Sequence, residues 1–515
     1  MAARVSSGRS AAPHLAVVFA LAFGLRLTFA TDQERSTSPW PVVTPESQGF
    51  DSGVLAELLE HVRTKGLPLH NLLLVRRGQL ILDASLYPYS AGGLHDLASV
   101  TKSITSVLVG IALDKGHIES VRQPVVSLLP AAVRGRPDAR LQALTVENLL
   151  TMTSGLDCGF EPGERELAAM RHSDNWPAFA LALPMRAAPG TQYAYCSCNN
   201  HLLSAILSER TGGSALAFAR THLFDPLGIS AASWPADGQG RSHGWGDLHL
   251  LPKDLAKIGE LYRNGGTWNG RRIVSESWVR QSTRPLVRVR EGVGYGYSWW
   301  INTARTPAIY EAVGRGGQRV AVVPDKELVI VFNGGGIDTD AIAPLLFQAL
   351  RSDQAIAVRA GGPERLAAAM IAVRQPPAVR PARKAPSLAQ TISGTTYVAD
   401  DNPLGLRTLS LHFSNDHDRA DVALAFLGRQ WNVPLGLRGR PMISTSTPTG
   451  TPAAVSGRWV SDREFVLDLD TIAEVNHFVF RLTFDGDELR IIVDEVTGEL
   501  KGLPIRARRT SKSDD

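Results

Sequence analysis

The chain has 515 residues, of which 44% are hydrophobic and 20% are charged. This is a globular composition, and the length predicts two or three domains. The 54 Lys and Arg residues exceed the 50 Asp and Glu residues by only four, and no basic run is interleaved with aromatic residues. That pattern excludes an extended nucleic-acid-binding surface and favours a catalytic protein with a mixed surface.

Residues 1–30 have the features of an export signal. Arg4 and Arg9 form a basic start, residues 15–25 are apolar, and small residues suited to cleavage follow. Arg26 interrupts the apolar run, which is too short to span a bilayer. We therefore expect a periplasmic or secreted protein, with a buried N-terminal helix as the alternative.

The next segments predict a helix and a hairpin, followed by an apolar helix. Residues 31–50 are rich in Ser, Thr and Pro and indicate an extended stretch, whereas residues 51–64 have helical spacing. Apolar runs at 72–75 and 80–82 surround a Gly-containing turn and predict a β-hairpin. The apolar run at 104–113 predicts a longer helix.

Ser99 and Lys102 stand at the head of that apolar helix. Three residues apart, they would share one helical face, so the amine could reach the hydroxyl. A serine alcohol is a weak nucleophile until a base removes its proton, and a lysine with a lowered pKa can be that base. A surface serine and lysine are the alternative, because a two-letter motif is short.

The following region is mainly helical before strands return. Residues 140–280 carry several helix-like apolar spacings, and strands are predicted at 295–301, 318–323 and 328–332. A helix is expected at 341–350. Strands near both ends with a helical insert between them predict one antiparallel sheet with helices packed on it, which is an α+β fold.

The sequence pattern changes in the C-terminal third of the chain. Residues 31–355 are expected to form the first domain, and residues 356–388 a short helix and a proline-rich linker. Short alternating runs within 389–510 predict a small antiparallel β domain. Residues 511–515 indicate a tail.

The chain contains three cysteines, Cys158, Cys196 and Cys198. In an oxidising compartment one pair could form a disulfide. Cys196 and Cys198 are awkwardly close for a direct bond, so Cys158 with either of them is favoured, and three reduced thiols are the alternative. Three cysteines are too few for a four-cysteine zinc site, and no metal or cofactor is expected.

Later segments add to the serine and lysine. Tyr195 follows a Pro-Gly turn, and the sequence Arg315-Gly316-Gly317-Gln318 opens a predicted strand. In this order and spacing the motifs resemble those of the serine β-lactamase and penicillin-binding-protein superfamily, in its class C-like esterase branch. The segments around Ser99 and Tyr195 are similar to the nylon-oligomer hydrolase group. The resemblance covers roughly residues 40–350.

This resemblance implies a β-lactamase/transpeptidase-like fold and a set of roles. Ser99 would be the acylated nucleophile. Lys102 would share its proton network and, as a cation, hold Tyr195 partly ionised. Tyr195 would then move the proton from Ser99 to the leaving group, which requires a phenol pKa well below about 10.

The resemblance also implies an oxyanion hole and a substrate-facing strand. The backbone N–H groups of Ser99 and Gln318 would stabilise the oxyanion. Gly316 and Gly317 would allow the strand backbone to approach the substrate closely. A bridge between Cys158 and Cys196 would stiffen the rim of the site.

Two positions depart from the family pattern. Ser197 occupies the place where Asn is usual. Its hydroxyl could still bind the substrate or Lys102, but it cannot donate an amide hydrogen bond to a β-lactam side chain. Arg315 occupies the first place of the usual Lys-Thr-Gly triplet, where it could bind a substrate carboxylate or remain a solvated charge. Both make a β-lactam a poor first choice of substrate.

We therefore predict a serine hydrolase that forms an acyl-enzyme on Ser99 with an ester or small amide. A small molecule would be its substrate, with no nucleic-acid partner and no membrane span after signal removal. One alternative is a β-lactamase or D-Ala-D-Ala peptidase. Another is a catalytically silent penicillin-binding-like protein, with the β domain as its binding module.

Overall fold

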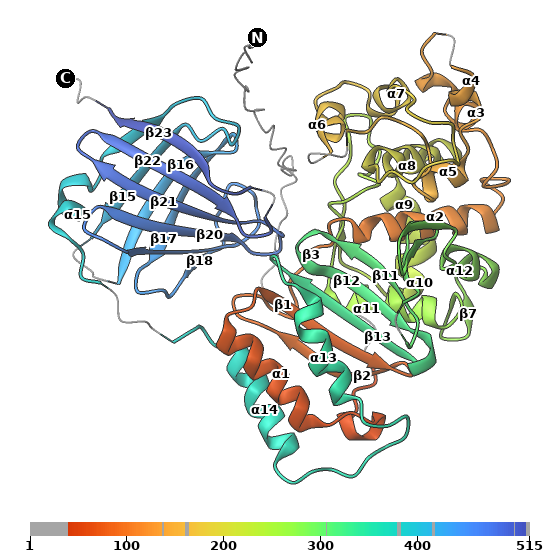
Figure 1. The fold of residues 1–515 in the computed structure, drawn as a ribbon, viewed down its shortest axis with the longest axis horizontal. Coiled ribbons are helices and arrows are strands. Elements are labelled where there is room, and N and C mark those ends of the chain that lie inside the picture. The colour runs from red at the N-terminus through yellow and green to blue at the C-terminus, as the bar shows by residue number, and fades with distance from the viewer. Residues whose placement is uncertain are drawn as a thin grey trace, which may run out of the picture.

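The computed structural model describes residues 40–135, 138–159, 164–304, 306–378, 383–414, 418–498 and 500–510. The predicted export signal and the predicted tail both lie outside these ranges. Two domains are seen, an α+β domain that ends with helix α14 and a C-terminal β barrel (Figure 1). Across the described ranges, no helix combines the length and hydrophobicity that a membrane span needs.

The α+β domain is built on one eight-stranded antiparallel sheet of order β2-β1-β13-β12-β11-β10-β9-β8. Distant segments meet in it, since Leu72 of β1 pairs with Phe332 of β13. The predicted antiparallel sheet with packed helices is thus confirmed. The strands are β1 (Leu69–Arg76), β2 (Gln79–Ser85), β8 (Val287–Arg290), β9 (Val293–Tyr295), β10 (Trp300–Asn302), β11 (Ile309–Gly314), β12 (Gln318–Val323) and β13 (Leu328–Gly334).

Both faces of this sheet are buried. Leu72 and Leu74 of β1 belong to one apolar core, and the alternate residues Leu73 and Val75 belong to the other. Because successive strand side chains point to opposite faces, a strand with an unbroken apolar run is covered on both sides. Helices α1 (Ser52–Lys65), α13 (Thr339–Ala349) and α14 (Gly362–Val373) pack in the first core, and α2 (Val100–Asp114) and α11 (Pro252–Arg263) in the second.

A helical subdomain is inserted between α2 and α11 (Figure 1). Its longest helix, α8, packs against α2. Its helices are α3 (Val125–Leu128), α4 (Ala139–Gln142), α5 (Val146–Leu150), α6 (Arg165–Arg171), α7 (Trp176–Leu181), α8 (Ser197–Thr211), α9 (Ala215–Ala219) and α10 (Asp225–Leu227). Helix α12 (Glu276–Ser282) and the short strands β3 (His95–Asp96), β4 (Ala232–Ser233), β5 (His249–Leu250), β6 (Thr267–Trp268) and β7 (Arg271–Arg272) complete the domain.

Helix α14 lies within residues 356–388, where the sequence predicts a short helix and a proline-rich linker outside the first domain. Its buried residues Leu366, Ala369 and Val373 share a helical face and join the core formed with α1 and α13. The helix is therefore an integral part of the α+β domain. The proline-rich composition that indicates a linker begins only after it.

The C-terminal domain is a ten-stranded antiparallel sheet that curls into a barrel. A contact between Gly436 of β17 and Ser456 of β19 closes it, and apolar side chains fill the interior. The predicted small β domain is confirmed. The strands are β14 (Thr396–Ala399), β15 (Thr408–Phe413), β16 (Arg419–Phe426), β17 (Arg429–Gly436), β18 (Met442–Ser444), β19 (Ala453–Trp459), β20 (Glu464–Thr471), β21 (His477–Asp485), β22 (Glu488–Glu495) and β23 (Leu503–Arg509), preceded by α15 (Ser387–Ile392).

Candidate active site

Ser99 directly precedes the first residue of α2, at the end of a tightly held turn. Ala98 has a φ of 45°, which is uncommon for a residue with a side chain. The backbone N–H of Ala98 donates to Oδ1 of the buried Asp96 at 2.8 Å, which braces this turn. The short strand β3 and the apolar helix α2 thus fix Ser99 from both sides in the sequence.

Lys102 reaches Ser99 as the helical spacing predicts. Its Nζ donates to Ser99 Oγ at 2.8 Å and to the backbone oxygen of Trp245 at 3.0 Å. Lys102 is only 2% exposed. Burial disfavours the charged amine and lowers the pKa of Lys102 to about 8. A neutral amine beside the hydroxyl is therefore accessible at mildly alkaline pH.

Tyr195 joins the same cluster. Lys102 Nζ lies 4.9 Å from the centre of its ring, and the ring stacks on Trp300 with centroids 6.1 Å apart. Burial and the charge of Glu164 raise the pKa of Tyr195, although a hydrogen bond with Ser99 acts in the other direction. The structure thus differs from the expected partly ionised tyrosine, because desolvation and the charge of Glu164 outweigh the hydrogen bond with Ser99.

Glu164 is a member of the site that no sequence motif indicates. Its carboxyl group is hydrogen-bonded to Ser197 and interacts electrostatically with Lys102. Burial raises the pKa of Glu164, while Lys102 and Ser197 oppose that shift. Ser197, at the place where the family usually has Asn, therefore contacts an acid from another loop.

The turn between β11 and β12 faces the start of α2. A Cβ built on Gly314 would lie 3.0 Å from the backbone nitrogen of Ser99 and 3.1 Å from Cβ of Gln318. Gly314 therefore lies between the backbone of Ser99 and the side chain of Gln318, the two residues whose backbone N–H groups are expected to form the oxyanion hole. Gly316 and Gly317 have φ values of 76° and 90°, which favour glycine.

Arg315 is engaged by the barrel. Its Nη1 donates to Thr497 Oγ1 and its Nη2 donates to Asn476 Oδ1, each at 3.1 Å, and Glu495 lies 3.6 Å away. The structure therefore differs from the expectation of a solvated charge, whereas a role as ligand for a substrate carboxylate stays a prediction. Nothing near Arg315 in the sequence indicates these partners.

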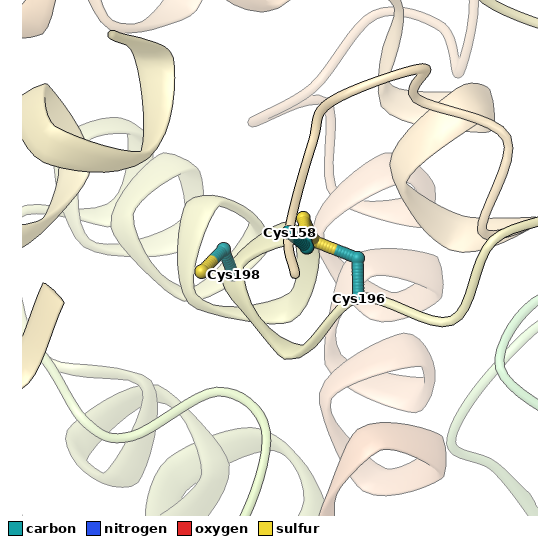
Figure 2. A group of neighbouring side chains, drawn as sticks. All are labelled: Cys158, Cys196 and Cys198. Carbon is teal, nitrogen blue, oxygen red and sulfur yellow. A yellow bond between two sulfur atoms is a disulfide. The ribbon is translucent and has the colours of Figure 1, made fainter. Parts of the chain in front are cut away.

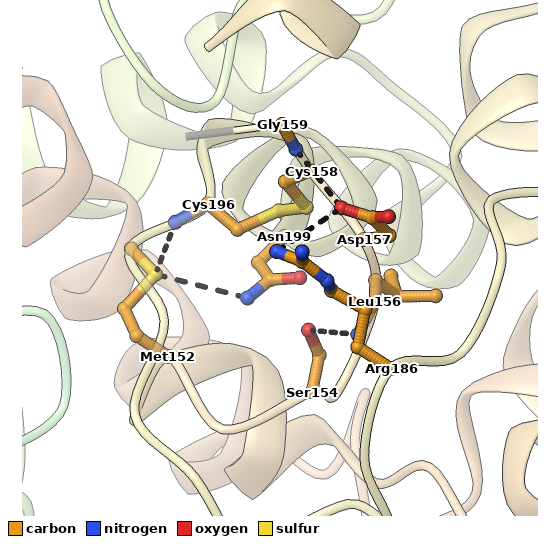
Figure 3. The surroundings of a disulfide bond; sticks show 9 residues. All are labelled: Met152, Ser154, Leu156, Asp157, Cys158, Gly159, Arg186, Cys196 and Asn199. Atoms are coloured by element: carbon orange, nitrogen blue, oxygen red, sulfur yellow. Dashed lines mark hydrogen bonds and ion pairs between the residues drawn. A yellow bond between two sulfur atoms is a disulfide. The ribbon is translucent and has the colours of Figure 1, made fainter. Parts of the chain in front are cut away.

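A disulfide joins Cys158 to Cys196, with the Cα atoms 5.6 Å apart, and Cys198 remains a buried thiol (Figure 2). Cys196 is next to Tyr195 and caps α8, and its backbone N–H donates to Sδ of Met152 at 3.4 Å (Figure 3). Among the described residues, these three cysteines are also the one group placed to hold a metal ion, but the bridge uses two of their sulfurs.

The chain is similar to several known proteins. A family model described as Beta-lactamase matches residues 55–344, from α1 to α13, and does not extend to the barrel. A 6-aminohexanoate-dimer hydrolase of Paenarthrobacter ureafaciens is 26% identical over 341 residues, which are 62% of this chain and 85% of that protein. A D-aminopeptidase of Cereibacter sphaeroides is 25% identical over 54% of this chain and 57% of its own length. The solved structure of a family VIII carboxylesterase is 17% identical, covers 64% of this chain and 98% of that chain, and has a TM-score of 0.48.

Proposed function

The chain belongs to the beta-lactamase family, and from that premise we propose that it is a serine hydrolase that forms an acyl-enzyme on Ser99. The observation that carries the proposal is the 2.8 Å hydrogen bond between Lys102 Nζ and Ser99 Oγ. A buried amine with a lowered pKa can activate a hydroxyl at this distance. Esters and small amides are the proposed substrates.

In the acylation step, the neutral amine of Lys102 accepts the Ser99 proton while Oγ attacks the substrate carbonyl. The backbone N–H groups of Ser99 and Gln318 stabilise the negative charge that develops on the carbonyl oxygen. Tyr195, whose raised pKa keeps it protonated, gives its proton to the leaving group and regains one from the Lys102 ammonium. The C–O or C–N bond of the substrate then breaks, and the acyl group remains on Ser99.

In the deacylation step, water attacks the acyl carbon and the neutral Lys102 accepts a proton from it. The bond to Ser99 Oγ breaks, and the proton returns to that oxygen. The same two N–H groups hold the oxyanion in both steps, so one arrangement serves the whole cycle.

Two features of the chain favour an ester or a linear amide over a β-lactam. Ser197 stands at the usual Asn position and bonds to Glu164, and Arg315 bonds to the barrel. Neither is therefore free to recognise a β-lactam in the way the family pattern implies. The similarity to a 6-aminohexanoate-dimer hydrolase supports an amide as one candidate substrate.

Export of the protein is also part of the proposal. A disulfide between Cys158 and Cys196 suits the periplasm or the extracellular space, where such bonds persist. The export signal at residues 1–30 supports the same location. N-terminal sequencing of the secreted or periplasmic protein should then find a start close to residue 31, and retention of residue 4 would contradict this.

The deciding experiment replaces the nucleophile. We expect Ser99→Ala to abolish hydrolysis of p-nitrophenyl esters and to prevent covalent labelling by a fluorophosphonate. Ser106→Ala is the matched control, because Ser106 lies on the same helix and its buried Oγ has no hydrogen-bond partner among the described residues. Circular dichroism should show both variants folded.

Three outcomes would contradict the proposal in different ways. Unchanged turnover in Ser99→Ala would remove Ser99 from the mechanism. Rapid nitrocefin hydrolysis or stable penicillin labelling by the unaltered protein would favour a β-lactamase or peptidase. A folded protein that no activated ester acylates would indicate a catalytically silent binding protein.

A further inference from the structure

Three barrel residues form a receptor for the Arg315 side chain, which we call the Arg315 clamp: Asn476, Glu495 and Thr497. Glu495 is 2% exposed, and its carboxylate accepts hydrogen bonds from Asn476 and Thr497 in addition to its ion pair with Arg315. A buried carboxylate needs such partners, because an uncompensated charge inside a protein is costly. The clamp is therefore a preformed site for the guanidinium.

The turn that carries Arg315 is held equally firmly from the sheet side. The Gln318 side chain donates to the backbone oxygen of Arg315 at 3.2 Å, and its Oε1 accepts from Asn333 Nδ2 at 3.1 Å. The backbone oxygen of Gly316 accepts from the N–H of Gly336 at 2.9 Å. The turn thus lies between β13 and the barrel. There is no room for a side chain at Gly316, because a Cβ there would lie 2.3 Å from Val475 Cγ1.

The barrel also reaches the other half of the site, where α2 begins. The backbone N–H of Asp96 donates to the oxygen of Ala473 at 2.7 Å, and Asp96 in turn accepts from Ala98, next to the nucleophile. In the same barrel loop, Glu474 pairs with His249 at 3.4 Å. One loop between β20 and β21 therefore contacts both segments that carry the proposed oxyanion donors.

We propose that the barrel is a working part of the active site and that Arg315 is a positioning residue. Through the clamp, Arg315 fixes the turn from which the backbone N–H of Gln318 points to the oxyanion. The inference rests on the proposed function, because it concerns the same oxyanion hole. Its physical basis is that such donors act only within a narrow range of distance, so a shift of a few tenths of an ångström lowers the rate.

The test compares two esters with the same p-nitrophenyl leaving group, a neutral butyrate and a succinate monoester that carries a carboxylate. We expect Arg315→Gln and Glu495→Gln each to lower kcat for both esters by a similar factor, about tenfold or more, with KM nearly unchanged. Thr497→Val removes one hydrogen bond of the clamp and should give a smaller loss of the same kind. Fluorophosphonate labelling of Ser99 should be slower but complete.

Asp470→Asn is the matched control. It alters a different contact between the domains, the 2.9 Å hydrogen bond from Tyr89 Oη, which neither Arg315 nor a residue of the clamp forms. We expect its kcat to equal that of the unaltered protein. Thermal unfolding of every variant should show a folded protein at the assay temperature.

Two results would overturn the inference. If Arg315→Gln loses activity only on the carboxylate ester while Glu495→Gln is unaffected, Arg315 binds substrate. If neither variant changes kcat on either ester, the clamp has no part in catalysis. Both results require an unaltered protein whose ester turnover is lost in Ser99→Ala. Failure of the proposed function would show instead as turnover that survives Ser99→Ala or as no ester turnover at all, so the two failures are distinguishable.

Discussion

Lys102 and Tyr195 both contact Ser99, and burial moves their pKa values in opposite directions. It lowers the pKa of Lys102 to about 8 and raises that of Tyr195 above its ordinary value. Desolvation always disfavours the charged form, which is the protonated amine but the deprotonated phenol. Two groups whose pKa values are separated in this way can act as a base and an acid, which supports the proposed roles of Lys102 as acceptor of the serine proton and of Tyr195 as donor to the leaving group.

The pH dependence of the reaction follows from Lys102. Only its neutral form accepts a proton, so kcat/KM for a neutral ester should rise with pH and level off, with a midpoint near pH 8. Lys102→Arg keeps a permanent cation in the site and should lower kcat by about 10²- to 10⁴-fold. Stopped-flow or plate assays between pH 6 and pH 10 measure both. A midpoint near pH 10 would contradict the lowered pKa.

The role of Tyr195 depends on the leaving group. A p-nitrophenolate leaves without taking up a proton, whereas an amine must be protonated. We therefore expect Tyr195→Phe to lower kcat for a small amide by about 10²- to 10⁴-fold and to affect a p-nitrophenyl ester much less. Equal losses on the two substrates would instead make Tyr195 the base for Ser99.

At the scale of elements, the disulfide connects the loop after α5 to the beginning of α8. It closes a segment of 38 residues that contains Glu164, and it ends beside Tyr195. Cross-linking such a loop restricts the unfolded chain more than the folded one. Two groups of the site thus come from one covalently closed segment, whereas Ser99 and Lys102 come from α2.

This bridge predicts definite thiol counts and a stability effect. Denatured protein should react as one thiol before reduction and as three after it, measured with a chromogenic disulfide reagent. Replacing Cys158 and Cys196 together with serine should lower the free energy of unfolding by about 2–4 kcal/mol, measured by urea denaturation. Cys198→Ser is the control that leaves the bridge intact. Three thiols before reduction would show that no bridge forms.

The elements also show how far a sequence can be interpreted. Ser99 and Lys102 were predictable because helical spacing alone brings them together, and β1, β2, β12 and β13 were predictable from their apolar runs. The single strand expected at 295–301 is wrong, because only its two ends belong to strands, β9 and β10, with a turn between them. The place of Glu164 in the site was not predictable, because a single acidic residue in a polar loop has no hydrophobic periodicity or motif around it. The partners of Arg315 were not predictable either, because Asn476 and Glu495 belong to another domain and only the folded chain brings them close.

For the whole molecule, a partly buried ion pair between His249 and Glu474 joins the two domains. Burial alone would lower the pKa of His249, but the charge of Glu474 and its hydrogen bond raise it to about 10. Asp96 lies in the same group, and burial raises the pKa of its carboxyl. Proton binding at this contact therefore favours the docked, folded molecule.

The contribution of the ion pair between His249 and Glu474 to the free energy of unfolding should consequently decrease with rising pH. A histidine whose pKa is higher in the folded than in the unfolded protein stabilises the folded protein. That stabilisation is complete below the pKa of the unfolded histidine, about 6.5, and it is lost as the pH rises through the folded value of about 10. The difference in Tm between the unaltered protein and Glu474→Gln should thus be greatest between about pH 5 and pH 6.5 and small above pH 10. A difference that grows with pH would contradict the assignment.

The pairing of β1 with β13 also sets the order in which the molecule can form. The strand next to the first hairpin is made only after the whole helical subdomain, so the central sheet cannot close during most of synthesis. Contacts this distant in sequence form slowly, whereas the barrel consists largely of neighbouring hairpins that can assemble locally. The residues of the Arg315 clamp emerge only after the whole α+β domain. A partly made chain therefore already contains Ser99 and Lys102, but under our proposal its oxyanion hole is not yet held in position, so we expect the nascent chain to be less active than the finished protein.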